Sequence, residues 1–275
     1  MISCIICSRN SDISRELKTN ITSTIGCEYE LVVVDNSDNR YSMFSAYNEG
    51  VSRAKGDILC FMHEDVFYYT PNWGRVVEEY FTNDINLGLL GILGSHYLAK
   101  CVCGVGDSSL ISAYYYAQSK LYDFSRFFNT DGSVEVVVVD GMWFCIKKSL
   151  FFSEIRFDET FQGFHYYDMD ICLQVLRAGY SCKVTKNVLL KHMSFGAIDN
   201  VFLRNSFKFY KKWENMLPIV RGASFSEEER RLSHELSSMA AYARELDYYN
   251  RRYNNMWCVR LHRQIKRILK RILNM

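Results

Sequence analysis

The N-terminal part of the chain alternates short, continuous apolar runs with stretches of mixed polarity at helical spacing. The apolar runs at residues 2–8, 30–37 and 57–62 predict strands, and residues 11–20 and 43–54 predict the helices between them. Continuous apolar runs are typical of strands covered on both faces, and helices of this length between strands imply right-handed crossovers. The pattern therefore predicts an α/β fold with a mostly parallel, Rossmann-like sheet flanked by helices.

The middle of the chain is less regular, but it still separates into elements. They are, in order, residues 72–81 (helix), 87–93 (strand), 134–139 (strand), 142–148 (strand), 168–178 (helix closed by Gly179) and 181–192 (a closing strand pair). Residues 109–128 are crowded with Tyr and Phe and contain no motif that we can interpret.

The pattern changes again after Pro218. Ser226 and Glu229 have the spacing of a helix capping box. The apolar residues that follow at helical spacing are Leu232, Leu236, Met239, Ala243 and Leu246. We therefore expect one domain over residues 1–217 and an appended helical extension over residues 218–275.

Polar side chains follow each of the first three predicted strands. They are Ser8-Arg9, Asp35-Asn36 and His63-Glu64-Asp65, the last within the stretch FMHEDV. Parallel strands place their carboxyl ends at one edge of the sheet, where ligands bind in such folds. Uncompensated charge is costly inside a fold, so each end is either a solvated turn or part of a site. Three such ends on one edge favour a site.

Five segments, taken in order, resemble the family 2 glycosyltransferases of GT-A fold. They are VVVDNS, NEGVSRAKGDILCFMHEDV, DGMWFCIKK, FDETFQGFHYYDMDICLQVLRAGY and KHMSFG, and the resemblance covers residues 1–197. It implies an inverting, metal-dependent hexosyltransferase that uses a nucleoside-diphosphate sugar, with UDP favoured. The implied acceptor is a hydroxyl of a glycan or lipid-linked glycan, in the synthesis of a surface polysaccharide.

The resemblance also implies roles on the donor side. Asp35 matches the aspartate that hydrogen-bonds the nucleotide base, and His63-Glu64-Asp65 stands where the family has its Asp-x-Asp motif. Asp65 then ligates Mn²⁺ or Mg²⁺, while His63 departs from the usual aspartate and leaves the role of that position open. Ser8 and Arg9 join the donor site.

A second metal or diphosphate contact is implied at His192, which ends the last predicted strand in LLKHMSFG. Imidazole is an acceptable ligand for Mn²⁺, although a lone histidine is often structural. A divalent cation makes chemical sense here, because it neutralises the charge of a leaving diphosphate as a Lewis acid. Such ions need only one or two protein carboxylates besides the phosphate oxygens.

On the acceptor side, Asp168 matches the family's general base, with Tyr167 in place of a glutamate. Asp170 is assigned to the acceptor side as the more structural of the two aspartates. Gly141 and Trp143 match the acceptor-side segment, where an indole could stack on a sugar ring. A place for Trp143 in the core is the open alternative.

Two other functions are compatible with parts of this pattern. A non-catalytic carbohydrate-binding or scaffold protein could keep the fold, and His63 and Tyr167 are the departures that favour it. A nucleotidyltransferase would also use strand-end carboxylates and a metal, but it normally has a Gly-rich loop after the first strand. SRNSDISREL contains no glycine.

The charge distribution sets the end of the chain apart. The total is +2, but residues 248–275 contain eight Lys or Arg and no acid, which leaves −6 on the rest. The apolar residues of this tail that share one helical face are Leu261, Ile265, Ile268, Leu269 and Ile272. A basic amphipathic helix predicts attachment to an anionic membrane surface, with packing on the domain or in a homo-oligomer as the alternative. An acidic body without a recognition motif argues against nucleic acid.

The sequence also bears on cellular location. No apolar run approaches the ~20 residues of a membrane span, and the start MISCIICSRN lacks the features of a signal peptide. Ten cysteines without an export signal are expected to be reduced thiols. We expect a cytoplasmic protein, which the basic tail could hold to the inner face of the cell membrane.

Overall fold

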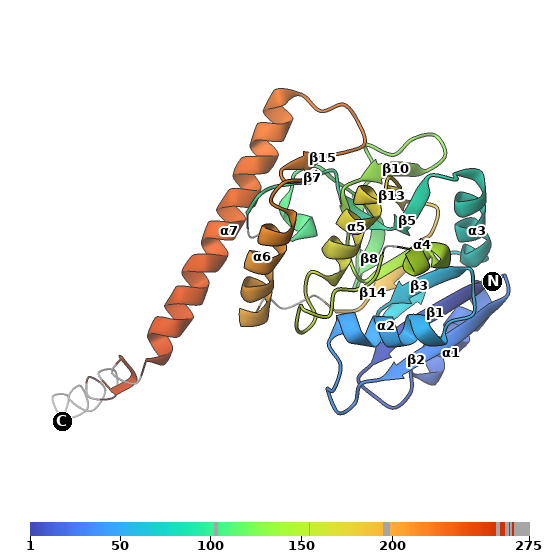
Figure 1. The fold of residues 1–275 in the computed structure, drawn as a ribbon, viewed down its shortest axis with the longest axis horizontal. Helices are drawn as coiled ribbons and strands as arrows, with labels where there is room; N and C mark the ends of the chain where they lie inside the picture. The colour runs from blue at the N-terminus through green and yellow to red at the C-terminus, as the bar shows by residue number, and fades with distance from the viewer. Residues whose placement is uncertain are drawn as a thin grey trace.

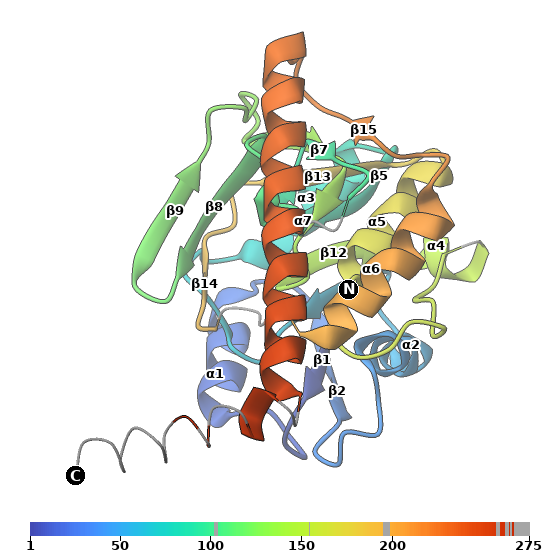
Figure 2. The same ribbon diagram turned by 90° about the vertical axis from the view of Figure 1, so that its left-hand side faces the viewer.

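The computed structural model describes residues 1–101, 104–153, 155–194, 199–256, 259–261, 264 and 266. A seven-stranded sheet, in the order β10-β13-β5-β12-β3-β1-β2, forms the centre of the body. A second sheet, in the order β11-β6-β8-β14-β4, lies beside it, and a long helix, α7, runs along one side of the molecule (Figures 1 and 2).

The first three strands form the parallel part of the seven-stranded sheet. β1 (Ile2–Ser8) lies between β2 (Tyr29–Asp35) and β3 (Ile58–Met62), and both pairings are parallel. Ser8 is in register with Asp35 at the carboxyl end of this pair. The predicted convergence of polar strand ends on one edge is therefore present.

The rest of this sheet is mixed rather than mostly parallel. β12 (Trp143–Lys147) is antiparallel to β3 and to β5 (Leu87–Gly91), while β13 (Ser181–Thr185) is parallel to β5 and antiparallel to β10 (Ser133–Val136). Trp143 pairs with Met62, so β12 begins at the edge where β3 ends and must run back across the sheet.

The second sheet contains the segment that is rich in Tyr and Phe. Its strands are β11 (Val138–Val139), β6 (Leu93–Ser95), β8 (Ile111–Ala117), β14 (Leu190–His192), β4 (Val66–Tyr68) and β9 (Lys120–Phe124), which pairs with β8. A short pair joins β7 (Tyr97–Leu98) to β15 (Ile219–Val220). The continuous run predicted at residues 134–139 divides at Val137 between the two sheets, and residues 181–192 divide in the same way.

Five of the seven α-helices in the described part of the chain were predicted, and α4 and α6 were not. The seven are α1 (Arg15–Thr24), α2 (Met43–Arg53), α3 (Trp73–Asn83), α4 (Lys148–Ser153), α5 (Tyr167–Arg177), α6 (Asn200–Trp213) and α7 (Glu227–Asn255). α1 begins later than predicted, because the Ser14 side chain caps it by accepting from the Leu17 N–H at 3.1 Å. The capping box of Ser226 and Glu229 is confirmed at the start of α7.

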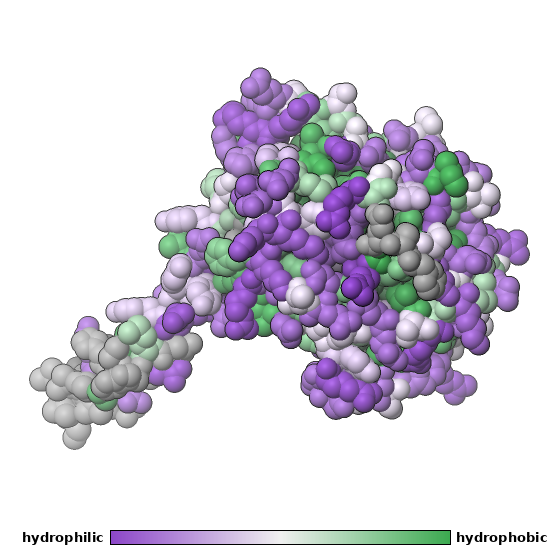
Figure 3. Space-filling view, viewed as in Figure 1, coloured by the Kyte–Doolittle hydropathy of each residue, from purple (hydrophilic) through white to green (hydrophobic). Residues whose placement is uncertain are grey.

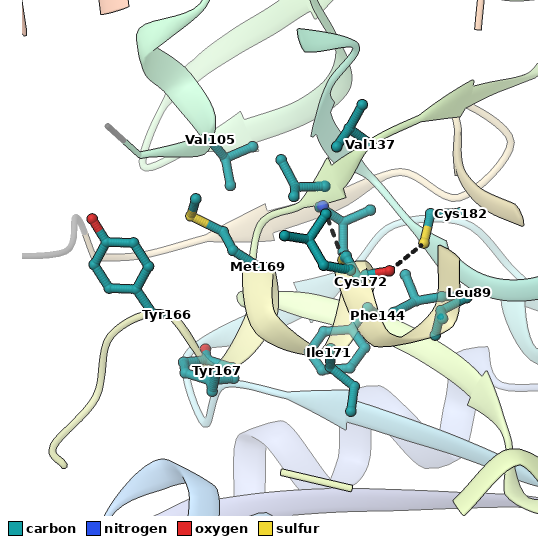
Figure 4. Close-up of a cluster of buried hydrophobic side chains, with 14 of the residues drawn as sticks. Leu89, Val105, Val137, Phe144, Tyr166, Tyr167, Met169, Ile171, Cys172 and Cys182 are labelled. Carbon is teal, nitrogen blue, oxygen red and sulfur yellow. Dashed lines mark hydrogen bonds between the residues drawn. The ribbon is translucent and has the colours of Figure 1, made fainter. Parts of the chain in front are cut away.

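Helix α5 packs its apolar side into the core between the two sheets (Figure 4). The Val139 N–H donates to the Cys172 sulfur at 3.4 Å, and the Cys182 thiol donates to the Cys172 carbonyl at 3.7 Å. These contacts, together with the burial of Ile171, fix the helix. Its first turn, with Tyr167 and Asp168, therefore has a defined place beside the strand ends.

Helix α7 is joined to the body by polar contacts. The hydroxyls of Ser233 and Ser108 are 2.6 Å apart, and Tyr97 lies 3.0 Å from His234. The visible surface is mainly hydrophilic with scattered hydrophobic residues (Figure 3). Within the part of the chain that the structure describes, no helix combines the length and apolarity needed to cross a membrane.

Candidate active site

The ends of β1 and β3 are tied together by Glu64. Its carboxylate accepts a hydrogen bond from the Ser8 hydroxyl at 2.6 Å and one from the Arg9 N–H at 3.3 Å. Asp35 accepts from the Ser37 N–H at 2.9 Å, and this hydrogen bond lowers the pKa of the Asp35 carboxyl. The structure thus gathers the predicted donor-side residues Ser8, Arg9, Asp35 and Glu64 at one edge of the sheet.

Three side chains from distant parts of the chain meet beside this edge. His63 and Asp65 follow β3, and His192 ends β14. His192 Nε2 lies 3.2 Å from His63 Nδ1 and 3.3 Å from an Asp65 oxygen. One ligand atom from each residue lies within 4.8 Å of the others, which is a spacing that one metal ion could bridge. Both predicted metal ligands, Asp65 and His192, belong to this group.

Electrostatics favours the metal-binding forms of these groups. Burial raises the pKa of Asp65, but hydrogen bonds from His192 and Ser194 outweigh it and hold that pKa well below its usual range. Burial, together with the nearby His192, lowers the pKa of His63. A charged carboxylate and a neutral imidazole are the forms that bind a cation.

Tyr167 supports His63 from the opposite side. Its hydroxyl lies 2.9 Å from His63 Nε2, so Nδ1 remains the nitrogen that faces His192. A Cβ at Gly141 would lie 2.1 Å from the Tyr167 oxygen, so only glycine leaves room for this contact. Tyr166 turns the chain with a left-handed φ of 74° just before the helix, which is a strained conformation of the kind that clusters at functional sites.

Asp168 lies next to this group, in the first turn of α5. One carboxylate oxygen accepts from the Gly141 N–H at 2.9 Å, and the other accepts from the Met169 N–H at 2.9 Å. Burial and the negative charge of Asp140 raise the pKa of Asp168 to about 7. A carboxyl group with a pKa near the working pH is well suited to accept a proton.

A cavity of about 360 Å³ joins these features. Its walls include His63, His192, Asp140 and Asp168. The other lining residues used below are Tyr115, Phe164, Arg244 and the segment 104–107. His63 and His192 of the candidate metal group thus open on the same cavity as Asp168, an arrangement that could hold a cation-bound anion beside a hydroxyl acceptor.

Sequence reasoning missed two parts of this cavity. Asp140 stands at the end of a valine run, directly before Gly141, and its position after a strand was the available signal. Arg244 comes from α7 and pairs with Asp107, with a nitrogen–oxygen distance of 2.6 Å. Nothing in the local sequence links these two residues, which are 137 positions apart.

The structure does not place Asp170 on the acceptor side, where it was predicted. It is buried at the junction of α5 and α6, where it pairs with Lys212 at 2.8 Å and accepts from the Trp213 indole N–H at 2.8 Å. Gln174 donates to the same carboxylate at 2.7 Å. Because these partners occupy the carboxylate away from the cavity, Asp170 is a structural residue in this structure.

Trp143 also corrects a prediction. Its side chain is 0% exposed and packs edge-on against Trp73, with the ring centroids 6.1 Å apart. A ring without exposed surface cannot stack on a sugar, so the alternative that placed Trp143 in the core is the one observed. Gly141, predicted with it, does line the cavity.

Comparison with known proteins agrees with the fold. A search of curated proteins gave no match. The fold resembles the crystal structure of GalNAc-T7 with UDP, GalNAc and Mn²⁺, with a TM-score of 0.56 and 14% sequence identity over 86% of this chain. The match covers 54% of that protein, so this chain spans about half its length. A197 from STIV gives a TM-score of 0.44 and 16% identity, over 70% of this chain and 86% of that one, and we draw nothing from it.

The family model named "Glycosyltransferase like family" matches residues 3–203, which is most of the chain. This match extends over all five segments that suggested the resemblance, and the similarity to GalNAc-T7 supports the same fold. The protein therefore belongs to the glycosyltransferase-like family, of family 2 type, and has the GT-A fold.

Proposed function

We propose that this glycosyltransferase moves a hexose from a UDP-sugar to a hydroxyl of a glycan or lipid-linked glycan, with inversion at the anomeric carbon. The observation that carries the proposal is the shared cavity, which is lined by Asp168 and by His63 and His192, the two histidines that group with Asp65. The bound UDP and Mn²⁺ named for GalNAc-T7 support the choice of donor and cation. Synthesis of a surface polysaccharide is the process that such a reaction would serve.

The donor set fits a divalent cation. Two imidazoles and one carboxylate suit Mn²⁺ better than Mg²⁺, which prefers oxygen ligands. The hydrogen bond of Tyr167 to the far nitrogen of His63 is the kind of outer contact that orients a metal-binding histidine. When bound, the cation neutralises charge on the diphosphate leaving group.

The chain's own residues would perform the proton transfer and the positioning. Asp168, held by the Gly141 N–H, takes the proton of the acceptor hydroxyl. Tyr115 and Phe164 line the same cavity and offer aromatic surface to a sugar, in place of the buried Trp143. Tyr115 belongs to β8, within the Tyr- and Phe-rich segment to which we assign acceptor selection.

A non-catalytic role remains the competing function, since His63 and Tyr167 both depart from the family pattern. Their contact with each other weakens this alternative, because Tyr167 orients the imidazole toward His192 instead of blocking the cavity. The two substitutions thus act as a pair that supplies a ligand. The pKa of Asp168, raised to about 7, also favours a catalytic function, because perturbed pKa values cluster at active sites.

The first experiment is a thermal-shift screen of nucleoside diphosphates with and without Mn²⁺. We expect UDP with Mn²⁺ to raise the Tm most, since a ligand stabilises the folded state by mass action, and EDTA to remove the effect. UDP release from a panel of UDP-hexoses and NMR of the product's anomeric proton would then identify the sugar and the stereochemistry. Binding without UDP release from any donor would favour the non-catalytic alternative, and no nucleotide binding would refute the proposal.

A cytoplasmic location and attachment to the inner face of the cell membrane complete the proposal. The residues that carry the attachment lie mostly outside the described part of the chain: Ile265, Ile268, Leu269 and Ile272. Co-sedimentation with anionic vesicles at low and high salt should show binding by the full chain that a chain ending at Asn255 lacks. Equal binding by both forms would refute this part.

A further inference from the structure

Helix α7 exposes an apolar stripe on its solvent side. The stripe consists of Leu232, Leu236, Met239, Tyr242, Leu246, Tyr249 and Tyr253, all of which are exposed. Met239 and Tyr242 are the most open, at 68% and 66%. A surface helix normally turns its apolar side toward the core, and a contiguous apolar patch on a surface marks an interaction site. No described part of the chain covers this stripe.

The body cannot cover the stripe, because the body holds the opposite side of the helix. Ser233, Ser237 and Ala241 are buried against it, and Arg244 pairs with Asp107. These residues also recur at steps of three and four, so at 3.6 residues per turn they form a separate face. A partner can therefore pack on the stripe without displacing the domain, as the free front of α7 in Figure 2 shows.

The spacing of the stripe fits another helix. Leu232, Leu236, Met239, Ala243 and Leu246 follow at steps of four, three, four and three, which is the a/d repeat of a coiled coil. α7 has 29 residues and is therefore about 43 Å long, and the repeat from Leu232 to Leu246 covers two heptads. A helical partner could interlock with it over about half of this length.

The charges along α7 identify the partner and its direction. Residues 227–235 have four Glu and two Arg, whereas residues 248–256 have two Arg and no acid. The beginning of the helix is therefore acidic and its end basic. Two copies that run antiparallel place the acidic start of one beside the basic end of the other, while parallel copies would oppose like charges. With six acids and five Arg over Glu227–Asn255, α7 also lacks the basic character that an anionic membrane attracts.

We infer that two copies of this chain form a dimer in which their α7 helices pack antiparallel through the apolar stripe. The middle of the stripe, at Tyr242 and Ala243, lies at the two-fold axis, where the small side chain of Ala243 lets the helices approach. Leu232 then faces Tyr253 of the other copy, and Met239 faces Leu246. This interface is isologous, because the same surface serves both copies.

The first test is the mass of the full chain by sedimentation velocity at micromolar concentration. We expect twice the monomer mass of 32.2 kDa. Leu236→Glu combined with Met239→Glu should weaken the dimer about 100-fold or more, because charge is forced into a desolvated seam. The matched control, Ile85→Glu with Phe207→Glu, changes two exposed apolar residues outside α7 and should remain dimeric. A monomeric wild type, or a dimer that survives the α7 substitutions, would overturn the inference.

The second test fixes the direction in an otherwise intact helix. Ala243→Cys should form an intermolecular disulfide, whereas Leu232→Cys alone should not. A mixture of Leu232→Cys and Tyr253→Cys chains should cross-link. The wild type, with its own ten cysteines, is the blank for each reaction. Cross-linking of Leu232→Cys to itself would show a parallel pair, and stripe-dependent binding of a monomer to vesicles would show that a membrane covers the stripe instead; either result contradicts the inference.

Discussion

Two aspartates on helix α5 have different electrostatic surroundings. Asp168 faces the cavity, where two backbone N–H groups hold its carboxylate and the neighbouring charge is the acid Asp140. Asp170 faces helix α6, from which Lys212 and Trp213 donate to it, and Gln174 of α5 donates to it as well. Only one residue lies between them in the sequence, but Asp168 faces the cavity and Asp170 faces another helix.

The difference shows how one helix can support both stability and chemistry. At the α5–α6 junction, burial raises the pKa of Asp170, and Lys212 and the hydrogen bonds limit that rise. In the cavity, no cation among the described contacts of Asp168 compensates the burial, so its pKa rises to about 7. A buried carboxylate without a cationic partner can exchange a proton near neutral pH. A carboxylate whose oxygens are all hydrogen-bonded to neighbouring side chains stabilises the fold instead.

The largest effect is expected at the cation side of the cavity. Asp65→Ala should abolish turnover and Mn²⁺-dependent UDP binding, because it removes the only carboxylate of the group His63, Asp65 and His192. The free energy of unfolding should fall by about 1–3 kcal/mol, because the hydrogen bonds that lower the pKa of Asp65 are lost. UDP calorimetry and thermal unfolding measure both quantities, with the exposed Asp38→Ala as control. Retained Mn²⁺-dependent binding would remove Asp65 from the cation site.

The base assignment gives the next largest effect. Asp168→Asn should leave UDP binding near normal and lower transfer by roughly 10²-fold or more, the usual contribution of a general base. Steady-state transfer assays separate the two steps. If Asp168→Asn retains full transfer while Asp170→Asn loses it, the roles of the two aspartates are reversed.

The pH dependence sharpens the same comparison. Since the pKa of Asp168 is about 7, the carboxyl is protonated below pH 7, and transfer should fall about tenfold per pH unit there. The free energy of unfolding depends on pH in the opposite direction from the transfer rate. A carboxyl group with a raised pKa in the folded state binds its proton more tightly there than in the unfolded state. Ionisation then lowers stability as the pH rises from about 4 to 7, so Asp168→Asn should be more stable than wild type at pH 8 and lose that advantage near pH 4. A wild-type rate that is flat from pH 5.5 to 8 would contradict the assignment.

At the α5–α6 junction the expected effect is on folding rather than on turnover. Asp170→Asn should lower the free energy of unfolding by about 1–3 kcal/mol, because an NH₂ group replaces one of the two acceptor oxygens and Lys212 loses its partner charge. Transfer per folded molecule should stay within about threefold of wild type, since Asp170 does not line the cavity. Urea unfolding and transfer assays on the same preparation test this pairing of results.

The smallest effect is expected at His63. His63→Asp restores the family's common residue and should remain active, because a carboxylate can also bind the cation. The loss of the Tyr167 contact should reduce the rate only modestly. Complete loss of transfer, with UDP binding intact, would mean that the imidazole has a task beyond holding the cation.

Much of the fold was predictable because its signals are local. Strands β1, β2 and β3 and helix α2 lie within one or two residues of the predicted ranges, since apolar periodicity and capping act over a few residues. Residues 134–139 were predicted as one strand, because a run of valines does not indicate where the chain passes from one sheet to another. The direction of β12 was likewise invisible, because it depends on a connection across the edge of the sheet.

The amino-acid sequence alone determined the α/β alternation, the polar strand ends and the chemistry available at them. Only the tertiary structure decided which of these side chains meet. His63 comes within hydrogen-bonding distance of Tyr167 and His192 across 104 and 129 positions, Arg244 reaches the cavity from α7, and Trp143 turns into the core. The physical reason is that hydrophobic pattern specifies which face of each element is buried, but the partner of that face is chosen by packing between segments far apart in the chain.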